Sequence, residues 1–221
     1  MKLSIIIPVF NEVATIKEIV SLVHKIPIEH EIILIDDASN DGSTQILQEL
    51  AADLDTLVLC HNVNLGKGAA IASGLKAATG DVAVIQDADL EYNPQDFVKM
   101  LRPIDRGEAH VLYGVRELQS QKAFMRLGNR FLTWLASILY DVKLSDIETC
   151  YKMMSRDVFE TLSLECQGFD VEAEITAKIL NAGYKIHELP IYYHARYDHK
   201  KLTPMDGLPT LVALVKYRFF K

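Results

Sequence analysis

Short apolar runs that alternate with helical patterns are the feature that most constrains how this chain can fold. The strand-like runs are Leu3 to Pro8, Glu31 to Ile35, Thr56 to Cys60, Val82 to Gln86 and Val111 to Gly114. The helical stretches between them are Val13 to Lys25, Ser43 to Leu54 and Gly68 to Ala78. Parallel strands need a crossover connection, which is usually a helix. The alternation therefore predicts an α/β fold with a Rossmann-like, mostly parallel central sheet flanked by helices.

The pattern changes after Arg116, where a long amphipathic stretch runs from Phe124 to Tyr140. A helix through Leu180, a strand from Lys185 to Ile191 and a final helix from about Gly207 to Phe220 are expected to follow. A chain of 221 residues without a repeat or a linker can bury one substantial core. We therefore expect a single domain, residues 1–221, with C-terminal amphipathic helices.

The amphipathic stretch from 124 to 140 has two interpretations. Apolar residues at helical spacing are typical of a helix that packs on a core. Alternatively, the helix lies on a membrane surface, where Arg126 and Arg130 meet lipid phosphates and Trp134 is an anchor. The sequence does not choose between them.

Polar side chains follow three of the predicted strands at the point where each strand ends. They belong to Phe10-Asn-Glu12, Asp36-Asp37 and Asp87-Ala-Asp89. The carboxyl ends of parallel strands border one crevice, which is where such sheets bind ligands. Asp87 and Asp89, at the end of a buried run, form a hard-oxygen site for a divalent cation such as one on a nucleoside diphosphate. The alternative is that they only end the strand and cap the next helix.

Composition narrows the class of function. The formal net charge of −7 argues against general nucleic-acid binding. Three cysteines without zinc-site spacing are typical of a reducing compartment, so we expect a cytoplasmic protein. The first apolar run is too short for a signal sequence, and no run approaches the ~20 residues of a spanning helix, so we expect any membrane association to be peripheral. Basic residues that favour an anionic partner gather near the end of the chain: Arg196, Lys200, Lys201, Lys216, Arg218 and Lys221.

A series of motifs resembles family 2 glycosyltransferases of the GT-A fold. The motifs are Ile6-Ile-Pro-Val-Phe-Asn-Glu12, Ile35-Asp-Asp37, Asn64-Leu-Gly-Lys-Gly-Ala-Ala70, Gly80-Asp81, Gln86-Asp-Ala-Asp-Leu-Glu91, Glu148-Thr-Cys-Tyr-Lys152, Gly168-Phe169 with Glu172 and Glu174, and Glu188-Leu-Pro-Ile-Tyr-Tyr-His-Ala-Arg196. Within that family the chain is most similar to the dolichol-phosphate mannose synthase group and its bacterial polyprenyl-phosphate relatives. The resemblance implies a nucleotide-sugar-binding half, residues 1–115, and an acceptor-side half with the C-terminal helix, residues 116–221.

The same resemblance implies a donor site at the strand ends. Residues expected to contact the nucleotide sugar are Pro8, Phe10, Glu12, Ile35, Asp37, Lys67, Asp87, Ala88, Asp89 and Arg116. Mg²⁺ or Mn²⁺ is expected on Asp87 and Asp89, with Glu91 as a further ligand or a spectator. Asp36 is expected to point into the fold instead.

The turn Gly66-Lys67-Gly68 lacks the spacing of a P-loop, which argues against a nucleoside triphosphatase. Gly68 is expected to allow close packing where a helix begins. Lys67 is expected either in solvent or near the donor.

On the acceptor side, a lipid phosphate is ionised at neutral pH and needs cations rather than a general base. Candidate acceptor-binding residues are Arg126, Arg130, Asp146, Arg196, Lys200 and Lys201, and the expected catalytic residues are Asp89, Glu148 and Arg196. Where mannose synthases carry Asp-Pro-x-Ser-Gly, this chain has Asp146-Ile-Glu-Thr-Cys150, so Asp146 competes with Glu148 for the acidic role. Glu148 is our choice, and its alternative role is a salt bridge that orients Lys152 or an arginine.

We therefore expect an inverting, metal-dependent transferase that moves a hexose from a nucleotide sugar of the GDP-mannose or UDP-glucose type to a polyprenyl phosphate at the cytosolic membrane face. The first alternative is a family 2 enzyme with a soluble or glycan hydroxyl acceptor. A silent sugar-nucleotide-binding module is another, although the intact Asp87 and Asp89 pair argues against it. A sugar-1-phosphate nucleotidyltransferase is not favoured, because the chain has no early Gly-rich phosphate loop.

Overall fold

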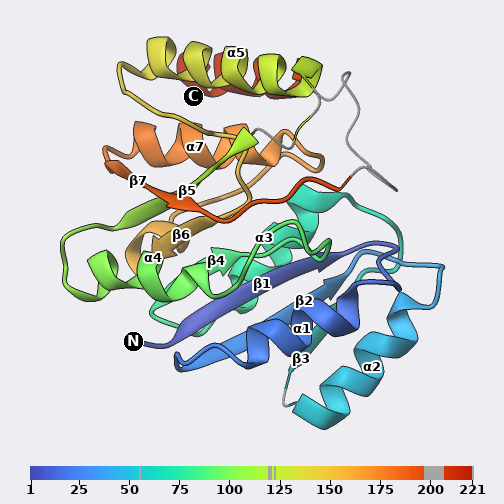
Figure 1. Cartoon of the computed structure of the whole chain (residues 1–221). Coiled ribbons are helices and arrows are strands. Elements are labelled where there is room, and N and C mark those ends of the chain that lie inside the picture. Colours follow the sequence, from blue (N-terminus) through green and yellow to red (C-terminus); the bar gives the residue numbers. More distant parts are fainter. Residues whose placement is uncertain (55, 119–120, 122, 197–206, 221) are drawn as a thin grey trace.

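A seven-stranded sheet forms the centre of the structure, in the order β3-β2-β1-β4-β6-β5-β7 (Figure 1). The structure is a computed structural model that describes residues 1–54, 56–118, 121, 123–196 and 207–220. In these ranges the strands are β1 (Leu3–Val9), β2 (His30–Asp36), β3 (Leu57–Cys60), β4 (Val82–Ile85), β5 (Val111–Arg116), β6 (Lys152–Ser155) and β7 (Ile186–Ile191). The helices are α1 (Ile16–His24), α2 (Ser43–Leu54), α3 (Lys67–Ala77), α4 (Asp96–Asp105), α5 (Ala123–Tyr140), α6 (Arg156–Phe159), α7 (Val171–Asn181) and α8 (Gly207–Phe219).

Most neighbouring strands are parallel, as the sequence pattern predicts. β1 pairs in parallel with β2 and β4, β2 with β3, and β5 with β7. β6 is the exception, because it runs antiparallel between β4 and β5. The sequence analysis did not predict this strand. Its four residues are all buried, so they show no alternation of polar and apolar side chains.

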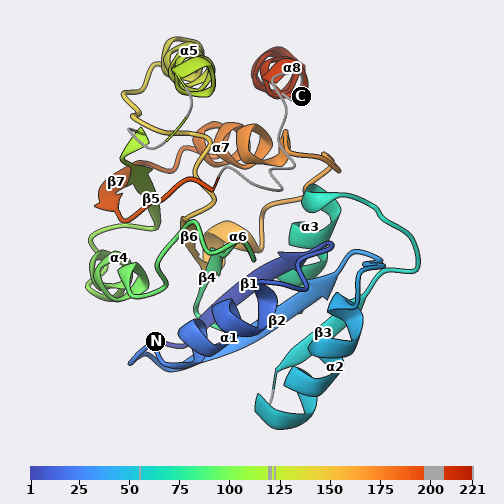
Figure 2. The ribbon, with the colours of Figure 1, turned by 45° about the vertical axis from the view of Figure 1, so that its right-hand side comes forward.

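Helices cover both faces of the sheet, which confirms the predicted α/β fold. Successive side chains of a strand point to opposite faces, and Ile5 and Ile6 of β1 are both fully buried. On one face α3 packs so closely that a Cβ at Gly74 would clash with Ile6 and lie 2.9 Å from Ile35 Cδ1. On the other face lie α1 and α2 (Figure 2).

A second layer of helices lies outside the sheet. α5 and α8 run side by side over α7, as the end-on view in Figure 2 shows. The Tyr140 hydroxyl at the end of α5 donates to the Leu214 carbonyl oxygen of α8 at 3.0 Å. An apolar cluster joins the three helices: Leu132, Ala136, Tyr140, Ile147, Ala173, Ala177, Ala213, Leu214 and Tyr217.

Five large apolar residues of α5 face outward. Those that are 48 to 67% exposed are Phe124, Leu127, Phe131, Trp134 and Ile138. The core-packed interpretation is therefore wrong for most of this apolar stripe. None of the helices in the described ranges has the length and apolarity needed to cross a membrane.

Candidate active site

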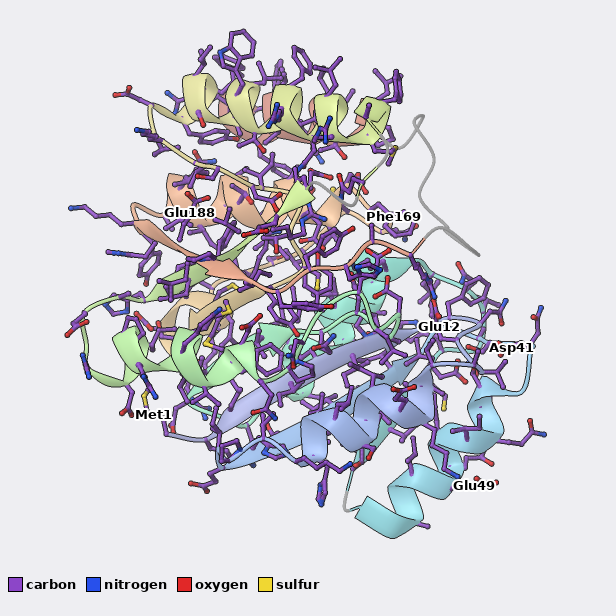
Figure 3. All side chains as sticks on the ribbon, in the orientation of Figure 1. Met1, Glu12, Asp41, Glu49, Phe169 and Glu188 are labelled. Atoms are coloured by element: carbon purple, nitrogen blue, oxygen red, sulfur yellow. The ribbon has the colours of Figure 1, made fainter. Side chains whose placement is uncertain are left out.

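A cavity of about 440 Å³ opens at the carboxyl ends of β1, β2 and β4, as expected from the polar residues that follow these strands. Glu12 after β1, Asp37 after β2 and Asp87 after β4 line it, and the opposite wall includes Arg116 and residues of α5 and α7. Figure 3 shows Glu12 and Phe169, which both line the cavity, on the same side of the molecule.

Asp87 and Asp89 place two carboxylates in this cavity. Asp87 Oδ1 lies 2.7 Å from Lys67 Nζ, and Asp89 Oδ1 accepts a hydrogen bond from the Glu91 amide at 3.1 Å. Burial, reinforced by the charges of Asp87 and Glu91, raises the pKa of Asp89 to about 7. Carboxylates whose ionisation is opposed in this way are compensated by a cation.

These two carboxylates fit a divalent cation that a substrate completes. Mg²⁺ is usually held through one or two carboxylates together with substrate phosphates. Glu91 does not supply a third, because Oε1 accepts from the Arg196 amide and Oε2 from the Tyr193 hydroxyl, both at 2.8 Å. Within the ranges that the structure describes, no group of three His, Cys, Asp or Glu is arranged to hold a metal. Of the two roles expected for Glu91, the spectator fits this geometry.

Lys67 stands beside the aspartate pair rather than in solvent. Its Nζ lies 2.7 Å from Asp87 Oδ1 and 3.1 Å from Glu172 Oε1. Burial alone would lower the pKa of Lys67, but the charges of Asp87 and Glu172 raise it, so the side chain stays protonated. Gly66 has a φ of +92°, and a Cβ at Gly68 would clash with the Cys166 carbonyl. The expected close packing at Gly68 is confirmed, and it fixes the backbone that carries Lys67.

The two aspartates after β2 have different surroundings. Asp36 points into the fold, as expected, and accepts from the Ser39 amide at 3.0 Å and the Thr44 hydroxyl at 2.6 Å. Asp37 lines the cavity but is also buried, and the backbone amides of residues 65–66 donate to its carboxylate at 2.9 and 2.7 Å. Asp37 therefore anchors the loop before Lys67 in addition to facing the cavity.

Arg196 joins the segment after β7 to the residues after β1. Its Nη1 and Nη2 lie 3.1 and 2.9 Å from the two carboxylate oxygens of Glu12, and its Nε lies 4.0 Å from Asp89 Oδ2. This bidentate contact places Arg196 among residues expected to bind the donor. Its expected contact with the acceptor stays a prediction.

A buried ion pair joins the end of β5 to the segment before β6. Arg116 Nε and Nη2 lie 2.6 and 2.8 Å from the two carboxylate oxygens of Asp146, and the side chains are 8% and 1% exposed. Burial would raise the pKa of Asp146, but the Arg116 guanidinium lowers it below its ordinary value. Arg116 lines the cavity and Asp146 does not. Asp146 therefore positions Arg116, and its expected direct contact with the acceptor is wrong in this geometry.

Glu148 is the acid of this segment that faces the cavity. Burial, opposed by Lys152 and reinforced by Glu172, raises its pKa to about 7. Its Oε1 is buried and, among the described residues, has no hydrogen-bond partner. Lys152 instead pairs with Glu172 at 2.5 Å, and Arg116 with Asp146. The alternative role of Glu148, a salt bridge that orients Lys152 or an arginine, is therefore wrong in this geometry.

We expect Glu148→Gln to stabilise the folded protein above pH 7 and to change little near pH 4.5. The pKa of Glu148 rises from an ordinary 4.5 to about 7 on folding, so ionisation of this group opposes folding as the pH rises through that window. One pKa unit corresponds to ~1.4 kcal/mol, so the gain at pH 8 is about 1–3 kcal/mol. Urea unfolding of both proteins at pH 4.5 and pH 8 measures it. An equal difference at the two pH values would contradict the raised pKa.

Several expected site residues lie away from the cavity. The Ile35 side chain is fully buried against α3, so its expected contact with the nucleotide sugar is wrong for the side chain. Arg126 and Arg130 lie on α5 but do not line the cavity, so direct contact with an acceptor inside it is not supported. Lys200 and Lys201 lie outside the described residues.

Other cavity residues were given no role by the sequence analysis. They are Tyr92, Gln121, Asn129, Glu172 and Tyr193. Glu172 stands in a quoted motif, but its contacts with Lys67 and Lys152 cross long sequence separations. Asn129 is buried on α5 and therefore needs a polar partner, but its burial is known only from the structure.

The fold and the site define a class: a GT-A arrangement, with one mostly parallel sheet and an acidic cavity at the carboxyl ends of its strands. The chain belongs to glycosyl transferase family 2, whose family model matches residues 4–163.

Two curated relatives share one name. An undecaprenyl-phosphate 4-deoxy-4-formamido-L-arabinose transferase of Pseudomonas fluorescens (strain SBW25) is 29% identical over 203 residues, which cover 89% of this chain and 58% of the relative. The protein of that name from strain Pf0-1 is 28% identical over 222 residues, with 96% and 63% covered. The chain therefore spans 58 to 63% of the length of these relatives.

Solved structures share the fold. Glucosyl-3-phosphoglycerate synthase from Mycobacterium tuberculosis, in complex with Mn²⁺, uridine diphosphate and phosphoglyceric acid, matches with a TM-score of 0.77 at 19% identity over 100% of this chain and 79% of that one. The same enzyme with Mg²⁺ and uridine diphosphate gives a TM-score of 0.75 at 19% identity, with 98% and 79% covered. At this identity the likeness shows the fold alone.

Proposed function

We propose that the cavity binds a nucleotide sugar together with Mg²⁺ or Mn²⁺ and that the protein transfers the sugar to a polyprenyl phosphate. The observation that supports this proposal best is the pair of neighbouring carboxylates, Asp87 and Asp89, that line the cavity at the strand ends. Family membership supports glycosyl transfer, and the names of the curated relatives support a polyprenyl-phosphate acceptor. The complexes of the structural neighbours with Mn²⁺ or Mg²⁺ and uridine diphosphate support the cation.

On the donor side, Asp87 and Asp89 would hold the cation, which stabilises the negative charge that develops on the departing diphosphate. Lys67, protonated and 2.7 Å from Asp87, adds a second positive group at the same place. Glu12 is held by the Arg196 fork and borders the end of the cavity where we place the nucleoside.

On the acceptor side, an ionised phosphate attacks without a general base. Arg116 and Arg196 are arginines that line the cavity. Their forks hold Asp146 and Glu12, and each guanidinium has further N–H donors with which it would bind the acceptor phosphate. Attack opposite the leaving diphosphate inverts the anomeric carbon.

Glu148 favours a second candidate function. A carboxyl with a pKa of about 7 is suited to act as a general base at neutral pH. An acceptor hydroxyl, on a soluble molecule or a glycan, needs such a base. The second candidate is therefore a family 2 enzyme with a hydroxyl acceptor, with Glu148 as the base.

The first experiment is a panel of radiolabelled nucleotide sugars incubated with undecaprenyl phosphate and Mn²⁺, scored by lipid-extractable label. We expect label from at least one donor, and its loss in EDTA. No lipid label from any donor would contradict a polyprenyl-phosphate acceptor. An undiminished rate in EDTA would contradict the role given to Asp87 and Asp89.

The outer face of α5 and α8 supports a membrane as the place where the acceptor is met. α8 adds exposed apolar residues to those of α5: Leu208, Val212 and, at its end, Phe219 and Phe220. Exposed apolar residues on two neighbouring helices are typical of proteins that lie on a bilayer. The cavity is lined at this side by Phe124 of α5 and Thr210 of α8, so it approaches the same face. We infer that this face rests on the membrane, on its cytosolic side.

We expect Phe131→Ser with Trp134→Ser to weaken partition onto anionic vesicles at least tenfold without lowering the melting temperature. Both side chains are about half exposed, so they contribute little to the core, whereas burying a large apolar side chain in lipid is worth about 1.5–3 kcal/mol. Flotation measures binding. Leu22→Ser with Val63→Ser removes exposed apolar residues elsewhere and is the matched control. Equal vesicle binding by the two double variants would contradict the inference that this face rests on the membrane.

The ionic strength distinguishes the electrostatic from the apolar contribution to vesicle binding. Exposed cations beside the apolar face, such as Arg130 and Arg218, add an attraction of about 1 kcal/mol each that ionic strength screens. The apolar contribution is not screened. Flotation at high salt is therefore expected to fall only in part.

A further inference from the structure

Buried hydrogen-bond acceptors without a partner belong to residues that line the cavity. In the described ranges, the buried side-chain oxygens and nitrogens that lack a hydrogen bond are Gln121 Oε1, Asn129 Oδ1, Glu148 Oε1 and Glu172 Oε1. All four residues line the cavity, and all four atoms are acceptors. Glu172 Oε1 lies 3.1 Å from Lys67 Nζ, so a charge compensates it. The other three have no such compensation and call for a ligand with hydrogen-bond donors.

Neighbouring hydrogen bonds fix which way the two amides point. Asn129 Nδ2 donates to Asp146 Oδ1 at 3.2 Å, and a flipped amide would set its oxygen against that carboxylate. Gln121 Nε2 donates to the Tyr193 hydroxyl at 3.1 Å, and that hydroxyl in turn donates to Glu91 Oε2 at 2.8 Å. Neither side chain can turn its amide without setting two acceptors against each other. The orientation of these unpaired acceptors is therefore fixed by the fold.

Asn129 and Glu148 stand next to each other on a rigid support. Asn129 Nδ2 and the Glu148 backbone amide both donate to Asp146 Oδ1 at 3.2 Å. The buried ion pair with Arg116 holds that carboxylate in place. The Asn129 side chain is itself 7% exposed. Acceptors held this firmly select a ligand by the position of its donors.

The chemistry of the three atoms identifies the part of the substrate that fits. A diphosphate or a lipid phosphate offers only acceptors at neutral pH, and an isoprenoid chain offers neither donors nor acceptors. A sugar hydroxyl donates one hydrogen bond and accepts others. The nucleoside of the donor also has hydroxyl and N–H donors, but we place it at the end of the cavity that Glu12 borders, where Arg196 holds that carboxylate. A Glu148 carboxyl with a pKa of about 7 can also donate to a hydroxyl oxygen when it is protonated. The phosphates belong with Lys67, Arg116 and Arg196 instead.

We propose that Gln121, Asn129 and Glu148 form the subsite for the hydroxyl groups of the transferred sugar, with Asn129 as a residue that determines which sugar is accepted. The proposal rests on the proposed function, because it assigns a part of the same substrate. A site built around a hydroxyl rejects an analogue that lacks it, since the protein acceptor is then left buried and unpaired.

The variant that tests the subsite is Asn129→Ala, with Asn181→Ala as the matched control. Asn181 also donates one amide hydrogen bond, to the Tyr217 carbonyl at 2.7 Å, but it does not line the cavity. Calorimetry with Mn²⁺ compares the affinity for UDP-glucose with that for UDP, and the affinity for GDP-mannose with that for GDP. We expect Asn129→Ala to weaken the sugar nucleotide at least tenfold and the bare diphosphate less than twofold, while Asn181→Ala changes neither.

A second measurement uses the unaltered protein and so does not depend on how the variant folds. Deoxy analogues of the bound sugar nucleotide, each lacking one hydroxyl, are expected to include at least one that binds tenfold more weakly. That analogue should bind Asn129→Ala and the parent protein equally. Deoxy analogues that all bind within twofold of the parent sugar nucleotide would overturn the proposal. It would also be overturned if Asn129→Ala lost as much affinity for the bare diphosphate as for the sugar nucleotide. Failure of both bare diphosphates to bind the parent protein would instead refute the proposed function itself.

Discussion

Asp89→Asn is expected to lower the transfer rate at least 100-fold while the melting temperature stays the same or rises. The loss follows because Asp89 is one of the two carboxylates that would hold the cation on the departing diphosphate, and 100-fold corresponds to ~2.7 kcal/mol of the barrier. The stability follows because Asp89 ionises against Asp87 and Glu91, so a neutral amide relieves repulsion. Initial rates and thermal melting are measured on one preparation.

Asp105→Asn, an exposed change at the end of α4, is the control for Asp89→Asn and should leave the transfer rate intact. If Asp89→Asn keeps more than a tenth of the parent transfer rate, Asp89 has no role in the mechanism. A melting temperature that falls together with the rate would favour the other interpretation of the motif, in which these aspartates only end β4 and support the following turn.

Asp146→Ala is expected to lower the free energy of unfolding by about 3–5 kcal/mol, because it leaves the Arg116 guanidinium buried without its partner. Denaturant unfolding at pH 7 is the measurement. Glu108→Ala is the matched control, since Glu108 pairs with Arg106 at 3.9 Å on the surface, where such a pair contributes about 0–1 kcal/mol. Equal stability of the two variants would contradict the buried pair. Glu148→Gln, two residues from Asp146, is expected to keep the fold.

Much of the fold could be predicted from the local hydrophobic pattern and the turn residues. The predicted strand from Leu3 to Pro8 appears as Leu3–Val9, and the predicted helix from Ser43 to Leu54 has the same bounds in the structure. Both depend on residues close in sequence, so periodicity and flanking turns are sufficient to find them. The strand-end rule likewise placed Glu12, Asp37 and Asp89 at one cavity before any contact between them was known.

Contacts between distant residues account for what the sequence did not predict. Glu91 looks like a third ligand in Asp87-Ala-Asp-Leu-Glu91, but Tyr193 and Arg196, more than a hundred residues further on, occupy its carboxylate. Asp146 and Glu148 are two residues apart and chemically similar. Their roles differ because Arg116, thirty residues earlier, pairs with only one of them. No local pattern encodes such partners.

The outward face of α5 shows a different limit. Hydrophobic periodicity finds an amphipathic helix but does not say which side of the helix meets the protein. The side packed on α7 and α8 carries Leu132, Ala136 and Tyr140, and Phe131 and Trp134 face outward. A bilayer and a protein core present similar apolar surroundings, so the sequence pattern is the same for both.

We propose that a nucleotide-sugar donor bound in this cavity delivers its sugar to a polyprenyl phosphate. The most direct test of this proposal compares initial rates of label transfer from the active donor to undecaprenyl phosphate and to undecaprenol, the same lipid ending in a hydroxyl, with Mn²⁺ and equal lipid presentation. We expect labelled product with the phosphate and less than a hundredth of that rate with the alcohol, because Arg116 and Arg196 would bind the phosphate and an ionised oxygen needs no base. Comparable rates with the two lipids, or transfer to the alcohol alone, would contradict the proposal and favour a hydroxyl acceptor activated by Glu148.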